Sequence, residues 1–197
     1  MAFITRLYKS IKLLLLPILL AVSFQAAAEG INVTRAKAQI TPKGQLAISS
    51  RFQTELPDQL KHVLIQGVPL HFSLSFQLSS PTLAAYKFKI GQVIGNSHAV
   101  AYKLSYHPLT SRYRVSVGTF STEYNSLESA LKAVGSIANW HVLNTGTLNK
   151  VSAAETKAEI RLTLSTAQLP KPFQINALTS KNWQLDSGWK PLTVIRE

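Results

Sequence analysis

Apolar and polar residues alternate along most of the chain after residue 30, a pattern typical of strands with one buried face. The clearest case is residues 70–78, where every second position is apolar. The same alternation predicts strands over residues 45–53 and 157–164. Because the intervening positions are polar, we expect antiparallel sheets that are solvated on one side. Shorter strands are expected at residues 32–40, 86–90, 182–186 and 189–195.

Two stretches have helical spacing instead. Residues 57–66 carry one apolar stripe between a proline and a glycine, which suit the start and end of a helix. Residues 126–134 carry a second stripe, and Asn125 has capping-box spacing with Glu128. No repeat or linker divides the chain. We therefore predict a single mainly β domain over residues 29–197, an antiparallel β-sandwich, immunoglobulin-like in architecture, with about eight strands and two short helices.

One predicted hairpin, residues 98–118, can be assigned a register. A four-residue loop pairs His107 with Arg112, which places three tyrosines on the core face and the polar side chains outside; a one-residue slip would bury charges. We call the resulting cationic row the basic strip, and it has no acid among its members. The strip consists of Lys103, His107, Arg112 and Arg114, and Lys87 and Lys89 could extend it.

The N-terminus has the three zones of an export signal. Arg6, Lys9 and Lys12 form a positive region, residues 13–22 an uncharged apolar core, and residues 26–28 a run of alanines suited to cleavage. The apolar core is shorter than the roughly 20 residues of a membrane span. We predict a cleaved signal peptide over residues 1–28 and a periplasmic protein; the alternative is an uncleaved signal that anchors the protein to the inner membrane.

Charge narrows the class of partner. Of the 21 Lys and Arg residues three lie in the signal, so the remaining chain carries 18 against 9 acidic residues, a net charge of +9. Export would remove nucleic acid as a partner, and anionic lipid headgroups, glycans or acidic protein surfaces remain. The chain has no cysteine, so its core must stabilise it without disulfides.

No residue set for a known chemistry is evident. The five histidines lack metal-site spacing, and there is no thiolate to assist them. Serines occur without a G-x-S-x-G elbow, and the two aspartates, Asp58 and Asp186, suit a helix start and a turn. We therefore expect a protein that is not an enzyme and that uses no metal or cofactor.

A second candidate contact region is a proline-bracketed segment near the C-terminal end. Two prolines should hold it stiff and extended, with little entropy to lose on docking; the alternative is a connection that carries the chain between sheets. Trp140, Trp183 and Trp189 are expected mostly in the core. The possible docking segment is Pro170, Lys171, Pro172 and Phe173.

Several segments together resemble a known family. The most specific are residues 106–118, Y-H-x-L-T-x-x-Y-R-V-S-V-G, and residues 169–173, L-P-K-P-F. In their order along the chain they resemble the proteobacterial exported family catalogued as domain of unknown function 4390. The chain departs from that family between Pro81 and Ala99, where it has only Tyr86 and Phe88 as aromatic residues.

The resemblance supplies no catalytic residues, and it implies gene neighbours that include a two-component sensor. Our leading hypothesis is therefore a non-enzymatic protein-interaction module of the cell envelope, in which the partner could be such a sensor. The alternative hypothesis is a binder or sensor of an anionic small molecule or lipid headgroup, which would use the basic strip.

Overall fold

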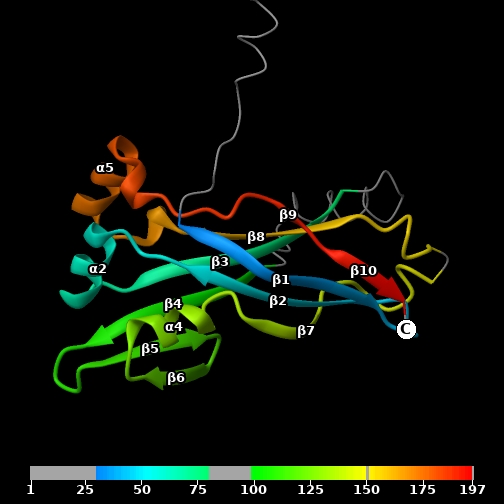
Figure 1. Ribbon diagram of the computed structural model, residues 1–197, viewed down its shortest axis with the longest axis horizontal. Helices are drawn as coiled ribbons and strands as arrows, with labels where there is room; N and C mark the ends of the chain where they lie inside the picture. Colours follow the sequence, from blue (N-terminus) through cyan, green and yellow to red (C-terminus); the bar gives the residue numbers. More distant parts are fainter. Residues whose placement is uncertain (1–29, 80–98, 150, 197) are drawn as a thin grey trace, which may run out of the picture.

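The computed structural model describes residues 30–79, 99–149 and 151–196, so the predicted signal and the predicted strand at 86–90 lie outside the described residues. The described chain forms ten strands in two sheets, three α-helices and two short 3-10 helices. Figure 1 shows the two sheets as stacked layers, with α2 (Asp58–Ile65) and α5 (Lys171–Thr179) together at one end.

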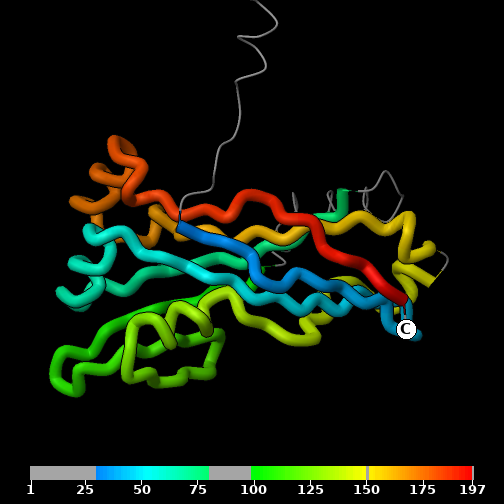
Figure 2. The backbone as a smooth tube through the Cα atoms, viewed as in Figure 1, coloured from blue at the N-terminus to red at the C-terminus, as the bar shows by residue number. Residues whose placement is uncertain are grey.

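Sheet A has four strands in the order β10-β1-β2-β7. They are β10 (Thr193–Arg196), β1 (Ile31–Ile40), β2 (Leu46–Thr54) and β7 (Ile137–His141). Strand β10 runs parallel to β1, whereas the other pairings in this sheet are antiparallel. Figure 2 shows the segments of β1 and β10, from opposite ends of the chain, side by side.

Sheet B has six antiparallel strands in the order β6-β5-β4-β3-β8-β9. Strand β3 lies inside the sheet, between β4 and β8, and its alternation is complete: its apolar side chains are all buried, and its polar ones are partly exposed. The strands are β3 (Leu70–Leu78), β4 (Ala99–His107), β5 (Arg112–Val117), β6 (Phe120–Tyr124), β8 (Ala158–Leu164) and β9 (Lys190–Pro191).

The core lies between the two sheets. Phe76 of β3 meets Trp140 of β7 edge to face, with ring centroids 5.5 Å apart. Gly135 packs so tightly against both layers that an added Cβ would stand 2.7 Å from Leu162 and 2.9 Å from Phe52. Its φ of +77° is also in the left-handed region that favours glycine. Helix α4 (Leu127–Ala133) inserts buried residues beside this contact.

These observations confirm a mainly β fold of two sheets. Helices α2 and α4 occupy the predicted stretches, but Ser126 is the cap of α4, not Asn125: its Oγ accepts a hydrogen bond from the Ser129 N–H at 3.2 Å. The predicted strand at residues 182–186 is wrong, because η2 (Lys181–Trp183) occupies its first half. The chain then follows β8 and changes sheets at buried Leu192, which splits the predicted strand at residues 189–195 into β9 and β10.

Candidate functional site

The basic strip lies on the outer face of sheet B. The register is the predicted one, with His107 opposite Arg112 and Tyr106 opposite Tyr113. The two tyrosine rings lie 4.9 Å apart, which fixes the hairpin from its inner side. On the outer side Lys103 and Arg112 are exposed. The structure therefore brings the four strip residues together on the two paired strands.

An acidic residue faces this strip, contrary to the sequence-based expectation. Glu123 comes from β6, where it pairs directly with Arg114. Its carboxylate lies 2.6 Å from the Arg114 Nη2 and 3.7 Å from the Arg112 Nη1. The hydrogen bond from Arg114 is the main cause that lowers the pKa of Glu123. The strip is therefore partly neutralised within the fold.

The neighbouring strand adds a histidine to the same face. His71 of β3 stands opposite Lys103. Partial burial, and secondly the positive charge of Lys103, lower the pKa of His71. Both effects favour the neutral imidazole, so His71 adds little positive charge to the basic strip.

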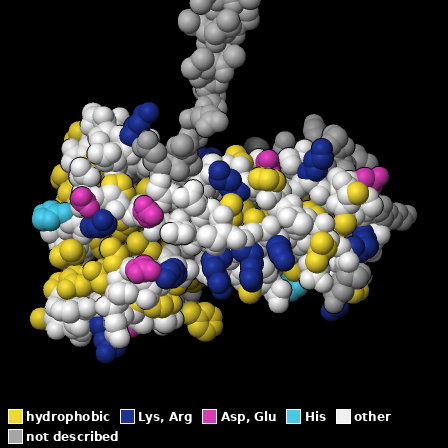
Figure 3. All heavy atoms as spheres, viewed as in Figure 1, with side chains coloured by type: hydrophobic (Ala, Val, Ile, Leu, Met, Phe, Trp, Pro, Cys, Tyr) yellow, Lys and Arg dark blue, Asp and Glu magenta, His cyan; other side chains and the backbone are white. Residues whose placement is uncertain are grey.

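A second group of cations lies on the outer face of sheet A. Arg35 of β1 stands directly opposite Arg51 of β2, and Lys37 follows two positions along β1. All three side chains are exposed, and no described acidic side chain forms an ion pair with any of them. Figure 3 shows Lys and Arg side chains gathered over β1 and β2. We call Arg35, Lys37 and Arg51 the sheet A cation cluster.

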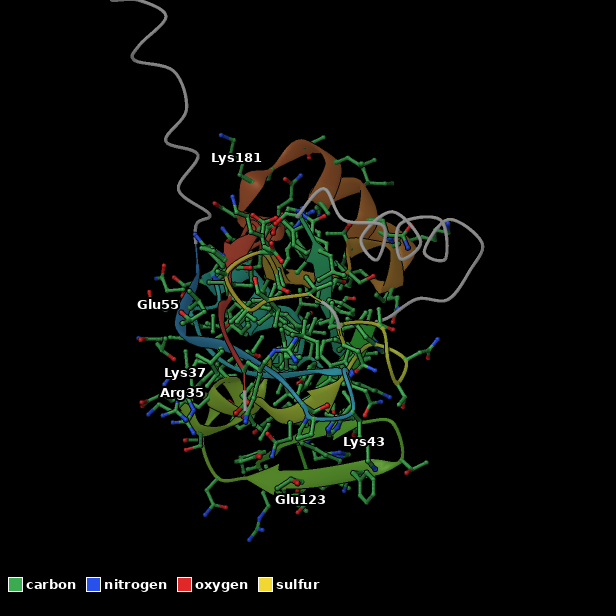
Figure 4. The ribbon with its side chains drawn as sticks, turned by 90° about the vertical axis from the view of Figure 1, so that its right-hand side faces the viewer. Arg35, Lys37, Lys43, Glu55, Glu123 and Lys181 are labelled. Atoms are coloured by element: carbon green, nitrogen blue, oxygen red, sulfur yellow. The ribbon has the colours of Figure 1, made fainter. Side chains whose placement is uncertain are left out.

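The nearest acid in sequence does not compensate this cluster. Glu55 follows the end of β2, four residues beyond Arg51, about 13 Å for an extended chain. Figure 4 shows Arg35 and Lys37 projecting from β1 on one side of the molecule, whereas Glu123 lies at the far edge on β6. Glu123, which forms ion pairs with the basic strip, is thus remote from the sheet A cation cluster.

A β-bulge places these cations outside. Val33 pairs with Phe52, whereas the next pair is Arg35 with Arg51, so Thr34 is an extra residue in β1. The Thr34 hydroxyl donates a hydrogen bond to the Arg51 carbonyl at 3.0 Å. Because an extra residue reverses the alternation, the inward positions change from odd to even numbers, and Arg35 and Lys37 face solvent.

The sequence contains the signal for this bulge, although the prediction missed it. In β1 the apolar positions are odd up to Val33 and even from Ala36 onward. A strand that keeps one face buried needs a one-residue irregularity at such a change. The shift from odd to even apolar positions within residues 32–40 therefore predicts that the side chains of Arg35 and Lys37 face solvent.

The possible docking segment is not extended. Lys171, Pro172 and Phe173 form the first turn of α5, and the Phe173 N–H donates to the Pro170 carbonyl at 2.9 Å. A first turn tolerates proline because its N–H would be unpaired there anyway. The Phe173 ring stacks on buried Trp183 at 5.5 Å. The segment therefore begins a helix that packs on the core, so the predicted extended conformation is wrong. Docking through this segment stays a prediction.

A third polar group lies on the outer face of sheet B, away from the strip. Arg161 of β8 forms an ion pair with Asp186, with 2.9 Å between its Nε and Oδ1. The guanidinium also lies 5.7 Å from the centre of the Trp189 ring. The hydrogen bond from Arg161 is the main cause that lowers the pKa of Asp186. Asp186 was expected in a turn, and its pairing with Arg161 was not predicted from the sequence.

The remaining residues considered for binding or metal coordination do not form a site among the described residues. Lys87 and Lys89 lie outside the described residues. Within residues 30–79, 99–149 and 151–196, no three His, Asp or Glu side chains are grouped so that they could hold a metal ion. Among the helices of that same part, none is both long and apolar enough to cross a bilayer.

Comparison with known proteins agrees with the motifs. No curated protein and no solved structure shows significant similarity to the chain. The model of the family described as Domain of unknown function (DUF4390) matches residues 28–193, which include both of the specific segments at residues 106–118 and 169–173. The chain therefore belongs to the DUF4390 family.

Proposed function

We propose that the protein is exported to the cell envelope and acts there as a non-enzymatic interaction module that binds an acidic surface of a protein partner. A membrane sensor's outer domain is one candidate partner. The sheet A cation cluster is the observation that carries the proposal, because its three cations are exposed and have no acidic partner among the described residues.

The energetics of the cluster favour an external partner. Like charges directly opposite on paired strands destabilise a sheet, by roughly 0.2–1 kcal/mol per pair. Arg35 and Arg51 are such a pair. A docked carboxylate would convert this repulsion into two charge-assisted hydrogen bonds, since arginine presents its donors in a planar fork that matches a carboxylate.

The shape of the surface favours a protein over a small molecule. The three cations project from neighbouring positions on the face of a sheet, so their charge is spread over a surface. Small-ligand sites, by contrast, are usually concave and bury most of the ligand. A broad acidic protein surface fits three such side chains together.

The basic strip supports a second candidate function, binding of an anionic small molecule or lipid headgroup. Glu123 is one acid against Lys103, Arg112 and Arg114, so the strip keeps positive charge after the ion pairs form. Because that charge is partly neutralised already, we rank this function below docking through the sheet A cation cluster.

Charge-reversal variants separate the two functions. Purified wild type, Arg35→Glu with Arg51→Glu, and the matched control Arg112→Glu with Arg114→Glu are used as baits for envelope extract of the native host. We expect wild type and the control to retain one stoichiometric acidic protein in a salt-sensitive manner, and the sheet A variant to lose it. Circular dichroism and urea unfolding check that each bait is folded.

Equal retention by all three baits would show that the sheet A cation cluster is not the docking surface. Co-purification of lipid or glycan in place of protein, lost only in the Arg112→Glu with Arg114→Glu variant, would favour the second function. Export has its own test: cell fractionation with intact-mass analysis should find a periplasmic protein that begins at Glu29. Full-length protein in the cytosol would contradict export and return nucleic acid to the candidate partners.

A further inference from the structure

A hollow of about 400 Å³ opens on the outer face of sheet B, at the end that carries α5. Its floor is formed by strands β3 and β8, and its walls by α5 and by the segment that follows η2. It is separate from the sheet A cation cluster, which lies on the other sheet. The residues on which the argument depends are Ser75, Arg161, Thr163, Leu178, Asp186 and Trp189.

The wall segment is held in place along β8. The Leu164 N–H donates to the Leu185 carbonyl at 2.8 Å, and the Ser187 N–H donates to the Leu162 carbonyl at 3.0 Å. These bonds bring Asp186 beside Thr163, where the two residues form an isolated β-bridge. The wall is therefore built onto the sheet by backbone hydrogen bonds.

The polar groups in the hollow orient one another. The Arg161 guanidinium binds Asp186 through Nε and Nη2, and the Gly188 N–H donates to the same carboxylate at 2.8 Å. Arg161 also contacts the Trp189 ring, which is 36 % exposed. A charged pair and an indole are thus held in fixed positions before any ligand arrives, which lowers the entropic cost of binding.

Several hydrogen-bonding groups in the hollow are still free to serve a ligand. Within the described residues, the hydroxyls of Ser75 and Thr163 and the Trp189 indole N–H have no hydrogen-bond partner. The Nη1 of Arg161 adds two more donors that Asp186 does not use. Leu178, which is 85 % exposed, and the Trp189 ring supply apolar surface beside them.

The charge balance restricts the class of ligand. Arg161 and Asp186 cancel each other, so the hollow favours neither an anion nor a cation. A ligand that fits must offer several hydroxyls for the free donors and acceptors, together with C–H surface for the indole and the leucine. We propose that this hollow binds a neutral saccharide, with one sugar ring against Trp189 and its hydroxyls directed to Arg161, Ser75 and Thr163.

The size of the hollow agrees with this ligand. Pockets that bind small molecules usually measure about 300–1,000 Å³, so this hollow is large enough for a sugar ring or a short glycan. The hollow is open, and exposed saccharide sites of this kind bind weakly. We therefore expect dissociation constants of the order of 1 mM, which correspond to about 4 kcal/mol of binding free energy.

Binding is tested by NMR and tryptophan fluorescence with the protein lacking its signal. The probes are methyl β-D-glucopyranoside, maltose, cellobiose and chitobiose, with sodium phosphate as an anionic comparison. We expect at least one saccharide to shift the Trp189 indole N–H signal saturably, and phosphate to leave it unchanged. Trp189→Phe identifies that signal among the three tryptophans by its disappearance.

Two leucine substitutions, one inside the hollow and one outside it, test whether the hollow is the binding site. Ser75→Leu places an apolar side chain in the hollow, whereas Ser105→Leu makes the same change on the outer face of β4, outside it. We expect Ser75→Leu to weaken binding by about tenfold or more and Ser105→Leu to leave it unchanged, with both variants folded by circular dichroism. No saturable shift by any saccharide up to about 50 mM, or equal binding by the two leucine variants, would overturn the proposal.

Discussion

The two sheets present outer faces of the same sign but with different surroundings. On sheet B the arginines meet acids: Arg114 pairs with Glu123, and Arg161 pairs with Asp186. On sheet A, Arg35 and Arg51 stand opposite each other, with no ion pair to any described acid. In both sheets the longer strands alternate apolar side chains, which face the core, with polar side chains, which face solvent. The difference comes from which neighbouring segments carry acids.

This comparison shows that a row of basic residues in the sequence does not indicate whether the folded protein leaves those residues without acidic partners. The basic strip is the more conspicuous one in the sequence, yet β6 brings Glu123 to it. The arginines of sheet A are 16 positions apart and meet only through the β1–β2 pairing. An interaction surface is therefore better sought among cations that the fold leaves without acids.

The largest expected loss of stability follows when the alternation of β1 is disturbed. This alternation is what directs Arg35 and Lys37 toward solvent. One alanine inserted between Ala36 and Lys37 should lower the free energy of unfolding by more than about 3 kcal/mol, because one half of β1 must expose two apolar side chains. Urea unfolding measures the loss. Insertion with wild-type stability would contradict the register of β1.

Deletion of Thr34 is the matched control. Because Thr34 is the extra residue, its removal joins the Val33–Phe52 and Arg35–Arg51 pairs in regular succession. Only the hydrogen bond from its hydroxyl to Arg51 is lost, so we expect a decrease of about 1 kcal/mol.

A smaller effect should follow when a paired arginine of sheet B loses its acid. Asp186→Asn should lower the free energy of unfolding at pH 7 by at most about 1 kcal/mol, since both side chains are more than a third exposed and the pair is screened. Because Arg161 lowers the pKa of Asp186, this stabilisation is present above its unfolded pKa and is lost as pH falls through the folded value. Urea unfolding of both proteins at pH 7 and pH 3 should therefore show the difference shrinking in acid.

On sheet A, removal of an arginine should raise the free energy of unfolding. Arg51→Ser should raise the free energy of unfolding by about 0.5 kcal/mol at low salt, because it removes a like-charge pair. The gain should shrink at high salt, where the repulsion in wild type is screened. A change in stability that does not vary with salt would show that repulsion between Arg35 and Arg51 contributes little in the folded protein.

The smallest effect concerns the titration of Glu123. Its pKa, lowered mainly by Arg114, should appear below that of a free glutamate in an NMR titration, and Arg114→Gln should return it toward the ordinary value. The ion pairs contribute above the unfolded pKa and are lost as pH falls through the folded one. In acid the basic strip then resembles the sheet A cation cluster. An unchanged pKa in Arg114→Gln would exclude this arginine as the cause.

Elements with a clear apolar period were predictable, and one register was too. The hairpin of β4 and β5 follows from the alternation of Tyr102, Tyr106 and Tyr113 with charged residues, because any slip would bury those charges. Strands β3 and β8 and helices α2 and α4 were predicted on the same basis. In each case one buried face selects the structure, and local sequence is sufficient to identify it.

The missed elements lack that signal. Strand β6 is an edge strand whose residues are nearly all exposed, so its sequence shows no apolar alternation. Helix α5 buries only Ala177 and leaves Ile175 and Leu178 exposed, so no apolar stripe distinguishes it from an extended segment. Because β6 supplies Glu123, the error in the fold produced the error about the basic strip.

The hollow beside α5 could not have been predicted from spacing. Arg161 and Asp186 are 25 positions apart, and they meet because the chain after Trp183 follows β8 in an irregular course. The predicted turn between two strands at residues 186–188 is wrong, because Asp186 forms an isolated β-bridge with Thr163 and Trp183 lies in η2. Only the hydrogen bond from the Gly188 N–H to the Asp186 carboxylate is the local contact that such a turn would make. Tertiary pairing then adds the partner that local chemistry cannot specify.

The parallel pairing of β1 with β10 has a mechanical consequence. Tension applied between the start of β1 and the end of β10 would act along both strands in opposite directions. The backbone hydrogen bonds that join Lys37–Ile40 to Thr193–Arg196 would then be loaded together in shear, instead of opening one after another. A pull on the two ends of the described chain would therefore be resisted where β1 pairs with β10.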